Sequence, residues 1–295
     1  MQESASSAPG KAVRVPDSHR KAVLRRLYKN PHVVVGATIM LIFILMAILA
    51  PILAPHDPFD QVAARRLLPP GGEHLMGTDN LGRDILSRLM FGARVTLVLS
   101  FSATAIGGVI GILIGLVSGY YGGALDSIVM RVIDVFLAFP GILLALFLVT
   151  ILGTSTMNIL IAISFFAVPT FARIARGSVL GTKKLEFIDA SRAVGATDGR
   201  IMFLHILPNI MTPLIVQATL FIATNIIVIA ALSFIGVGVQ PPTPEWGSMI
   251  DSGRDFVGRA DHIMFFPGLF ILFVVVGINI LGDGLRDALG PKQTK

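Results

Sequence analysis

Residues 186–208 read EFIDASRAVGATDGRIMFLHILP, the longest helical pattern of mixed polar and apolar residues in a sequence otherwise made of long apolar runs. Phe187, Ala190 and Val194 recur at helical spacing and share one face. A neighbouring strip of the same helix is polar and holds Glu186, Asp189 and Arg192. The pattern predicts a short amphipathic helix that begins near residue 186.

The residues that follow predict where this helix ends and what comes next. Gly195 can adopt the left-handed conformation that terminates a helix. Thr197 is a suitable N-cap for a second short helix, which Pro208 is expected to stop. Small side chains at Ala190 and Ser191 allow another surface to approach closely. We therefore expect a compact docking element between two membrane spans, although the helix alone is equally compatible with an amphipathic loop that docks on nothing.

The composition places the chain in a membrane. Of its 295 residues 54% are hydrophobic and 14% are charged, and the mean hydropathy is +0.78. Soluble domains typically carry about 25% charged residues, and no soluble domain of this length could hide so much apolar surface from water. The absence of Cys excludes disulfides, thiolate nucleophiles and cysteine metal ligands. Basic loops of a membrane protein explain the net charge of +6 without nucleic acid.

Six apolar stretches are each long enough to cross the ~30 Å hydrocarbon core as a helix. They cover residues 33–53, 95–119, 128–152, 158–180, 209–237 and 263–282. Each is expected to be helical because lipid offers no hydrogen-bond partner to an open backbone. The predicted fold class is an all-α membrane protein with six transmembrane helices, and an even number of spans puts both termini on one side.

The basic residues predict the orientation. An N-in, C-in arrangement with residues 186–208 in the cytoplasm leaves 17 of the 24 Lys and Arg inside and 7 outside, in agreement with the positive-inside rule. The chain then divides into a cytoplasmic N-terminal tail (1–31), a first span with a periplasmic loop (32–93), a domain with the other five spans (94–283) and a cytoplasmic C-terminal tail (284–295).

The first outer loop ends in GTDNLGRD at residues 77–84, and apolar residues at helical spacing follow from Ile85. The spacing predicts a helix lying in the outer interface before the second span. The preferred role of the loop is a turn that aims this span. The alternative is contact with an external partner, for which the candidates are Thr78, Asp79, Gly82, Arg83 and Asp84. Trp246, the only Trp, falls at a span end, where we expect it to anchor in the interface or to contact a partner.

The second apolar stretch carries Gly107, Gly111, Gly115 and Gly119 at intervals of four residues. This repeat predicts one smooth helix face for close packing against another helix.

Polar residues within the spans are few and uncharged. Gln217 and Asn225 are the candidates for a solute pathway, although uncharged polar residues in spans more often form hydrogen bonds between helices. The ionisable groups of a proton relay or voltage sensor are missing from the spans. Their absence argues against a proton-coupled transporter.

Signatures of catalysis are also missing. The sequence has no GxxxxGK[ST] loop for nucleotide phosphates and no GxSxG elbow, and its six His never recur at metal-ligand spacing. We expect no catalytic residue, no metal ligand and no cofactor in this chain. If the protein moves a solute uphill, another polypeptide must supply the energy.

The 186–208 stretch resembles the cytoplasmic "EAA" loop of bacterial ATP-binding-cassette (ABC) importer permeases, whose pattern is E-A-A-x3-G-x9-I-x-L-P. Asp189, Ala190 and Ser191 stand at the first three positions, and His205 replaces the Ile. The resemblance implies that this loop docks into a groove of an ATPase subunit. The residues it implicates in coupling are Glu186, Phe187, Asp189, Ala190, Ser191, Arg192, Gly195, Ala196, Leu207 and Pro208.

Further motifs are similar to the dipeptide/oligopeptide/nickel branch of binding-protein-dependent importers, and to its second, C-type permease subunit with glutathione-like members. They are GTD at 77–79, GRD at 82–84, FPG at 139–141, LSF at 232–234, PPTPEWG at 241–247 and GDGLR at 282–286. The resemblance implies the type I importer permease fold, with residues 94–283 as its permease domain. The implied partners are a second permease subunit, two ATPase subunits that bind ATP and Mg, an extracytoplasmic binding protein and a peptide substrate.

The sequence leaves several alternatives open. Within the same architecture the solute could be glutathione or chelated nickel in place of a dipeptide or oligopeptide. A secondary transporter not driven by ATP would require intramembrane ionisable groups or interrupted helices at matching places in two halves, and neither is visible. A membrane enzyme lacks a nucleophile, base and metal in this sequence, and a scaffold without transport activity would be distinguished by its failure to co-purify with ATPase subunits.

Overall fold

Residues 27–289 are described by the computed structural model, and they form helices and loops with two isolated β-bridges, Gly71–His74 and Thr78–Asp84, and no sheet. The all-α prediction is thereby confirmed. The predicted cytoplasmic tails, 1–31 and 284–295, lie outside the described residues except for 27–31 and 284–289.

Five helices are long and apolar enough to cross a membrane. They are α2 (Pro31–Leu53), α3 (Ile85–Tyr121), α6 (Thr156–Thr182), the continuous helical segment Asp198–Phe234 that contains α9 (Leu207–Phe234), and α11 (His262–Leu289). A shorter pair, α4 (Gly123–Leu137) and α5 (Gly141–Leu152), is bent by 89° at its break. The described part of the chain therefore has five candidate membrane spans, or six if the bent pair α4–α5 crosses as one span.

The predicted third span, residues 128–152, is not one straight helix. Its break falls at Ala138–Pro140, and Pro140 is the N-cap residue of α5. Proline has no backbone N–H to continue the ladder, and it pushes the residue before it out of the helical region. The apolar run predicted a membrane-embedded segment, and Pro140 bends it.

The second span begins ten residues earlier than its apolar run. Asp84 caps α3 by accepting a hydrogen bond from the Ser87 N–H, and the helix then continues without a break to Tyr121. The prediction of a separate interfacial helix from residue 85 is therefore wrong, since those residues form the first turns of α3. The predicted domain boundary between residues 93 and 94 lies inside this helix.

The glycines of α3 allow close contact with α6, as predicted. A Cβ atom added at Gly107, Gly111 or Gly115 would lie 2.2–2.5 Å from a backbone oxygen of α6. At Gly119 it would lie 3.0 Å from the Val179 Cβ atom. Backbone contact of this kind is how small residues join transmembrane helices.

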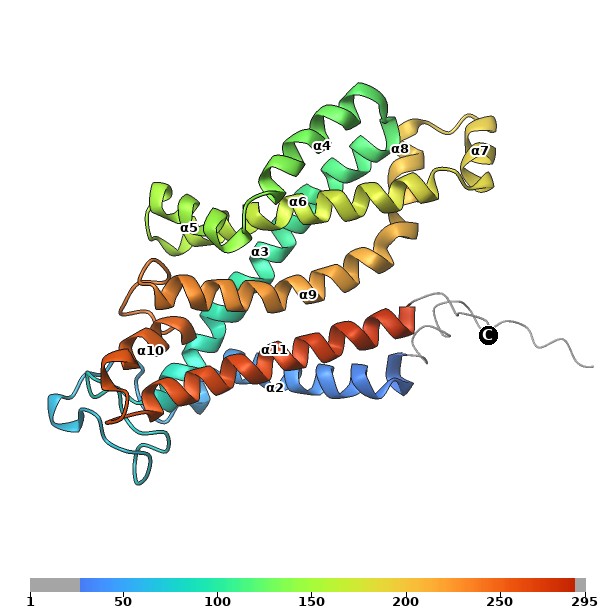
Figure 1. The fold of residues 1–295 in the computed structure, drawn as a ribbon. Coiled ribbons are helices and arrows are strands. Elements are labelled where there is room, and N and C mark those ends of the chain that lie inside the picture. The colour runs from blue at the N-terminus through green and yellow to red at the C-terminus, as the bar shows by residue number, and fades with distance from the viewer. Residues whose placement is uncertain (1–26, 290–295) are drawn as a thin grey trace, which may run out of the picture.

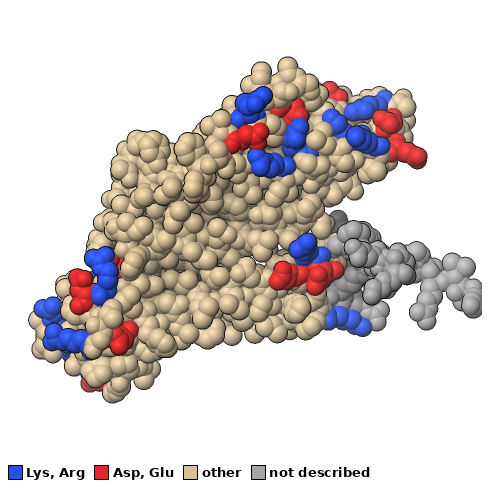
Figure 2. Space-filling model, in the orientation of Figure 1, with Lys and Arg blue, Asp and Glu red and all other residues tan. Residues whose placement is uncertain are grey.

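The helices run side by side, so that the molecule has two distinct ends (Figure 1). One end holds α7, the start of α2 and the end of α11, and the other holds α10 (Trp246–Gly253) and the loop before α3. We call them the α7 end and the outer end. On the face shown in Figure 2, charged side chains gather at both ends and over α4 and α6, and the remaining surface is almost free of charge.

Candidate functional site

The predicted amphipathic helix is α7 (Glu186–Ala193), and it lies beyond the ends of α3 and α6 at the edge of the molecule (Figure 1). One buried apolar side chain packs this helix against the rest of the chain. Ile188 is fully buried in an apolar cluster that includes Val179, Ile201 and Ile206. Sequence reasoning missed Ile188, because it lies outside the apolar face formed by Phe187, Ala190 and Val194.

That predicted apolar face is exposed. Phe187 is 40% exposed and Val194 is 85% exposed, and Ala190 also faces out. Glu186 and Asp189 are exposed as well, and Ser191 is half-buried. Because Ile188 is the buried apolar contact of this helix, the apolar and acidic side chains around it are free to meet another molecule.

Gly195 ends α7 in the left-handed conformation that the sequence predicts, with φ of +82°. The Gly195 N–H donates to the Arg192 carbonyl at 2.9 Å, and the Ala196 N–H donates to the Ser191 carbonyl at 3.0 Å. This pair of bonds is a Schellman motif. It turns the chain sharply, so that α7 stands as a short, defined unit.

A polar group connects α7 to the end of α3. The Tyr120 hydroxyl donates to Asp198 Oδ1 at 2.6 Å, and the Arg192 guanidinium lies 5.8 Å from the centre of the Tyr120 ring. Arg192 also pairs with Asp189 at 3.3 Å on the exposed side. The Lys183 ammonium donates to the Gly119 carbonyl at 2.7 Å and so caps the C-terminus of α3. Of these contacts, the one between Arg192 and Tyr120 joins α7 itself to α3.

Thr197 is the predicted N-cap, and its hydroxyl accepts a hydrogen bond from the Arg200 N–H at 3.4 Å. The helix that follows is not stopped by Pro208. A first turn, α8 (Asp198–Arg200), continues through the π-helical segment Ile201–Ile206 (η2) into α9.

The π-helical segment explains why Pro208 does not end the helix. In this segment the Leu207 N–H donates to the Met202 carbonyl, five residues back. A wider turn makes room for a proline ring that would otherwise clash with the carbonyl four residues earlier. Pro208 stands at the second position of α9, directly after this wider turn and inside the continuous segment Asp198–Phe234.

At the outer end, the loop before α3 is held by hydrogen bonds between its own residues. Asp79 accepts from the Arg83 side chain at 2.6 Å and from the backbone N–H groups of Leu81 and Arg83 at 2.8 and 3.0 Å. Thr78, Asp79, Arg83 and Asp84 are at most 5% exposed. A Cβ atom at Gly82 would lie 2.0 Å from the Val62 carbonyl oxygen. This burial corresponds to the turn that aims α3, and it does not support direct contact of these side chains with an external partner.

Trp246 does not anchor in the interface. It is fully buried, its indole N–H donates to the Leu89 carbonyl at 3.0 Å, and its ring packs edge-on against Phe43 and Phe270. The sequence could not show this, because α10 folds back between α3 and α11. Because the Trp246 side chain is buried, it also does not support direct contact with a partner.

Glu245 is a buried group that sequence reasoning missed. Its carboxylate caps α10 by accepting from the Gly247 and Ser248 N–H groups, each at 2.9 Å. Burial raises the pKa of this carboxyl above its usual value, and the bonds from Gly247 and Ser248 oppose that rise. Glutamate is not among the preferred N-cap residues, so no capping pattern in the sequence indicated this role.

The two candidates for a solute pathway have different environments. Asn225 is fully buried and donates from Nδ2 to the Thr104 hydroxyl at 2.9 Å, a bond between α9 and α3. It therefore takes the helix-linking role that the sequence favours for such residues. Gln217 is half-buried on α9, and its place in a pathway stays a prediction.

Two protein-family models match this chain. The model described as "Binding-protein-dependent transport system inner membrane component" matches residues 111–295. The model described as "N-terminal TM domain of oligopeptide transport permease C" matches residues 18–70.

Relatives are similar over almost the whole length. The chain is 46% identical to the dipeptide transport system permease protein DppC of Alkalihalophilus pseudofirmus, over 92% of this chain and 90% of the relative. It is 46% identical to the di/tripeptide transport system permease protein DppC of Pseudomonas aeruginosa, over 87% of each. The glutathione transport system permease protein GsiD of Pectobacterium atrosepticum is 43% identical, over 90% of this chain and 89% of the relative.

A solved structure shares the fold. A chain of the MetNI methionine ABC transporter, in an inward-facing conformation, aligns with a TM-score of 0.57 at 23% identity, over 68% of this chain and 96% of that chain. At that identity the likeness concerns the arrangement of helices alone.

Proposed function

Since the chain belongs to the family of binding-protein-dependent transport system inner membrane components, we propose that it is the permease subunit of an ATP-driven importer of dipeptides and oligopeptides. It is a multi-pass protein of the inner membrane. The observation that carries the mechanism is the exposed apolar face of α7, at the end of an otherwise apolar bundle.

Short peptides are the substrate class that the relatives support. Their names specify dipeptides, di/tripeptides and glutathione, which is itself a tripeptide derivative. Identities of 46% and 43% are too close to separate a dipeptide permease from a glutathione permease. We therefore infer a peptide of two or more residues, with glutathione as the alternative within the same architecture.

We infer that α7 docks on an ATPase subunit and so couples ATP hydrolysis to transport. Phe187, Ala190 and Val194 would fill an apolar groove, and Glu186 and Asp189 would face its polar rim. Gly195 and Ala196 would hold the angle of the helix. Leu207 and Pro208 lie at the start of α9, where they would orient the loop.

The orientation follows from the same site. An ATPase in the cytoplasm places the α7 end inside, together with the start of α2 and the end of α11 (Figure 1). This arrangement is N-in and C-in with six crossings, of which the bent pair α4–α5 is the third. It also places Lys183, Lys184 and Arg200 inside, in agreement with the positive-inside rule.

The proposed assembly contains a second permease subunit, two ATPase subunits that bind ATP and Mg, and an extracytoplasmic binding protein that delivers the peptide. This chain would bind no cofactor and catalyse no reaction. Closure of the ATPases would pull α7, and the contacts of Arg192 and Tyr120 would move α3 with it as a rigid body. Because the glycines of α3 join it to α6, the two helices would move together.

The test measures uptake of a labelled dipeptide by cells or vesicles that contain the complete assembly and its binding protein. We expect uptake to stop when ATP is depleted and to continue when a protonophore collapses the proton gradient. Excess unlabelled dipeptide should compete, and competition by glutathione in place of dipeptides would select the alternative solute. Uptake that survives ATP depletion and collapses with the proton gradient would instead indicate a secondary transporter.

A further inference from the structure

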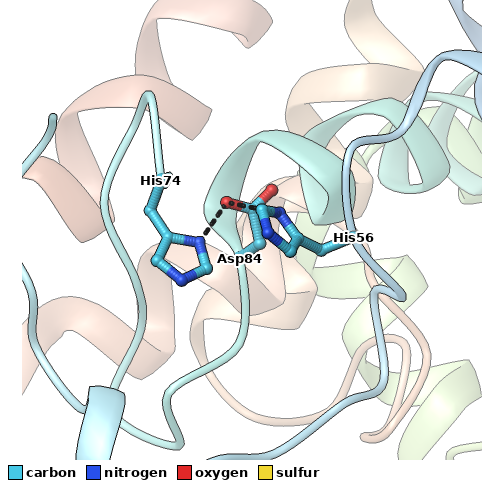
Figure 3. A group of neighbouring side chains, drawn as sticks. All are labelled: His56, His74 and Asp84. Carbon is cyan, nitrogen blue, oxygen red and sulfur yellow. Dashed lines mark hydrogen bonds and ion pairs between the residues drawn. The ribbon is translucent and has the colours of Figure 1, made fainter. Parts of the chain in front are cut away.

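Three side chains with metal-binding atoms meet at the outer end, far from α7. His56 lies in the segment after α2, His74 in the loop that follows, and Asp84 at the N-cap of α3 (Figure 3). One donor atom from each residue lies within 4.8 Å of the other two. The sequence predicted no metal ligand, because residues 18 and 10 positions apart do not form a ligand motif until the loop folds.

The distances are close to those of a coordination shell. His74 Nδ1 lies 2.9 Å from Asp84 Oδ1, and His56 Nδ1 lies 3.7 Å from the same oxygen. Zinc bonds of ~2.0–2.1 Å in a tetrahedron put neighbouring ligand atoms about 3.3 Å apart. The two histidine rings lie on the same carboxylate oxygen, with their centroids 4.6 Å apart. Small side-chain rotations would therefore bring all three atoms onto one ion.

The carboxylate is held in place for this role. Its second oxygen, Asp84 Oδ2, accepts from the Ser87 N–H and hydroxyl, each at 2.7 Å, so that Oδ1 is left to face the histidines. The nearby arginines Arg83 and Arg88 pair with Asp79 and not with Asp84. The negative charge of Asp84 therefore acts on the two imidazoles.

The imidazoles have unused bonding capacity. His56 Nδ1 is buried and has no hydrogen-bond partner among the described residues, and the same is true of His74 Nε2. Metal binding at His74 Nδ1 would move its proton to Nε2 and replace the 2.9 Å hydrogen bond to Asp84 Oδ1, while no bond at Nε2 would be broken. A buried nitrogen without a partner is unfavourable, and a metal would supply one for His56.

Access to the group is from one side only. His74 and Asp84 are 5% and 2% exposed, whereas the His56 side chain is 29% exposed. An ion could enter past His56 and leave its fourth position to water. Such a closed three-ligand pocket with one open position is the usual form of a zinc site that keeps a water.

We propose that His56, His74 and Asp84 form a binding site for a zinc-type divalent cation on the outer face of the permease. Two imidazoles and one carboxylate suit zinc, whereas calcium and magnesium prefer oxygen ligands. The bound ion would join the end of α2, the loop and the start of α3. The site does not depend on the proposed transport function.

The test measures Zn²⁺ binding to the purified full-length chain in its complex. After removal of metals with EDTA, the complex is titrated with Zn²⁺ in competition with a chromophoric chelator. We expect His56→Gln to weaken one Zn²⁺ site per chain by at least tenfold, because glutamine is not among the usual zinc ligands. The matched control is His262→Gln, a histidine at the same end that does not belong to the group, and it should leave the affinity unchanged.

A second measurement distinguishes a lost Zn²⁺ site from a misfolded protein. The His56 ring makes no hydrogen bond within the described residues, so its replacement removes the 3.7 Å contact with Asp84 Oδ1 but no hydrogen bond. Zn²⁺ should raise the thermal unfolding temperature of the unmodified complex and of the His262→Gln complex, and should not raise that of His56→Gln. Equal Zn²⁺ affinity in the unmodified and His56→Gln complexes, or no Zn²⁺ site removed by His56→Gln, would overturn the proposal.

Discussion

The two ends of this molecule differ in which side chains they bury and which they expose. At the outer end, Asp79, Arg83, Glu245 and Trp246 are buried and each takes part in a hydrogen bond. At the α7 end, the apolar side chain of Val194 is 85% exposed and the Asp189–Arg192 pair lies on the surface. The outer end buries several charged side chains, with the partnerless nitrogens of His56 and His74 beside them, whereas the α7 end exposes apolar and charged side chains.

The difference separates structural from interacting residues. A charged motif such as GTDNLGRD is easily mistaken for a contact surface, yet its charges hold a loop. The apolar side chains of Phe187 and Ala190 on α7, and of its C-cap residue Val194, are easily mistaken for a small core, yet they face out. Substitutions of buried residues at the outer end should therefore reduce the amount of folded protein. Substitutions around α7 should reduce coupling in a protein that still folds.

The largest loss of stability is expected for Trp246→Ala. Removal of a fully buried Trp costs about 3–5 kcal/mol in unfolding free energy, and the bond to the Leu89 carbonyl is lost as well. Unfolding in detergent, followed by far-ultraviolet circular dichroism, measures it. Uptake per folded complex should stay constant.

The control for this change is Phe265→Ala, an aromatic residue at the same end that is 60% exposed. Its expected cost is within about 0.5 kcal/mol. If both substitutions destabilise equally, Trp246 does not hold the outer end together.

An intermediate loss is expected for Gly115→Ala near the C-terminal end of α3, the helix that connects the two ends. The added Cβ would lie 2.2 Å from the Ala172 carbonyl oxygen, and the resulting overpacking should cost about 1–3 kcal/mol. The neighbouring Gly108 would place its Cβ 3.6 Å from the Phe171 ring, an ordinary contact. Gly108→Ala should therefore leave the unfolding free energy unchanged or raise it, because alanine favours the helix. Equal destabilisation by both would show that α3 and α6 are not in close contact.

Local patterns predicted much of this structure. Apolar runs located the five long apolar helices and the bent pair α4–α5, the glycine repeat predicted the α3–α6 contact, and Gly195 and Thr197 marked the ends of helices correctly. These features depend on residues close in sequence. Trp246, Ile188 and the His56–His74–Asp84 group could not be predicted in the same way, because their environments are formed by elements distant in the chain. Pro208 failed as a stop signal because a π-helical turn, which no propensity indicates, makes room for its ring.

A smaller loss of stability is expected at Gly195. The backbone at this position has φ of +82°, a conformation that favours glycine, so Gly195→Ala should lower the unfolding free energy by about 1 kcal/mol. No atom lies within 4 Å of the added Cβ, so a larger side chain such as that of Gly195→Trp would extend into open space beside α7. The protein should reach the membrane at a normal level, lose its ATPase subunits on purification and fail to transport.

Gly258 provides the matched control for Gly195→Trp. Its φ is +80° and its Cβ would also meet no atom within 4 Å, but it lies at the outer end. Gly258→Trp should retain the ATPase subunits. Unimpaired uptake by Gly195→Trp at a normal protein level would contradict the proposed role of α7.

The smallest loss of stability, and the sharpest separation of the two ends, is expected for Val194→Asp. A surface substitution usually changes the unfolding free energy by no more than about 0.5 kcal/mol, and Val194 is 85% exposed. If its side chain enters a groove of the ATPase, a carboxylate there loses its water without gaining a partner. We expect at least tenfold weaker retention of the ATPase subunits, which corresponds to about 1.4 kcal/mol of binding. Val257, 65% exposed at the outer end, receives the same substitution as the control and should retain them fully. Equal retention by Val194→Asp and Val257→Asp would mean that the exposed face of α7 is surface like any other, and that the coupling contact lies elsewhere.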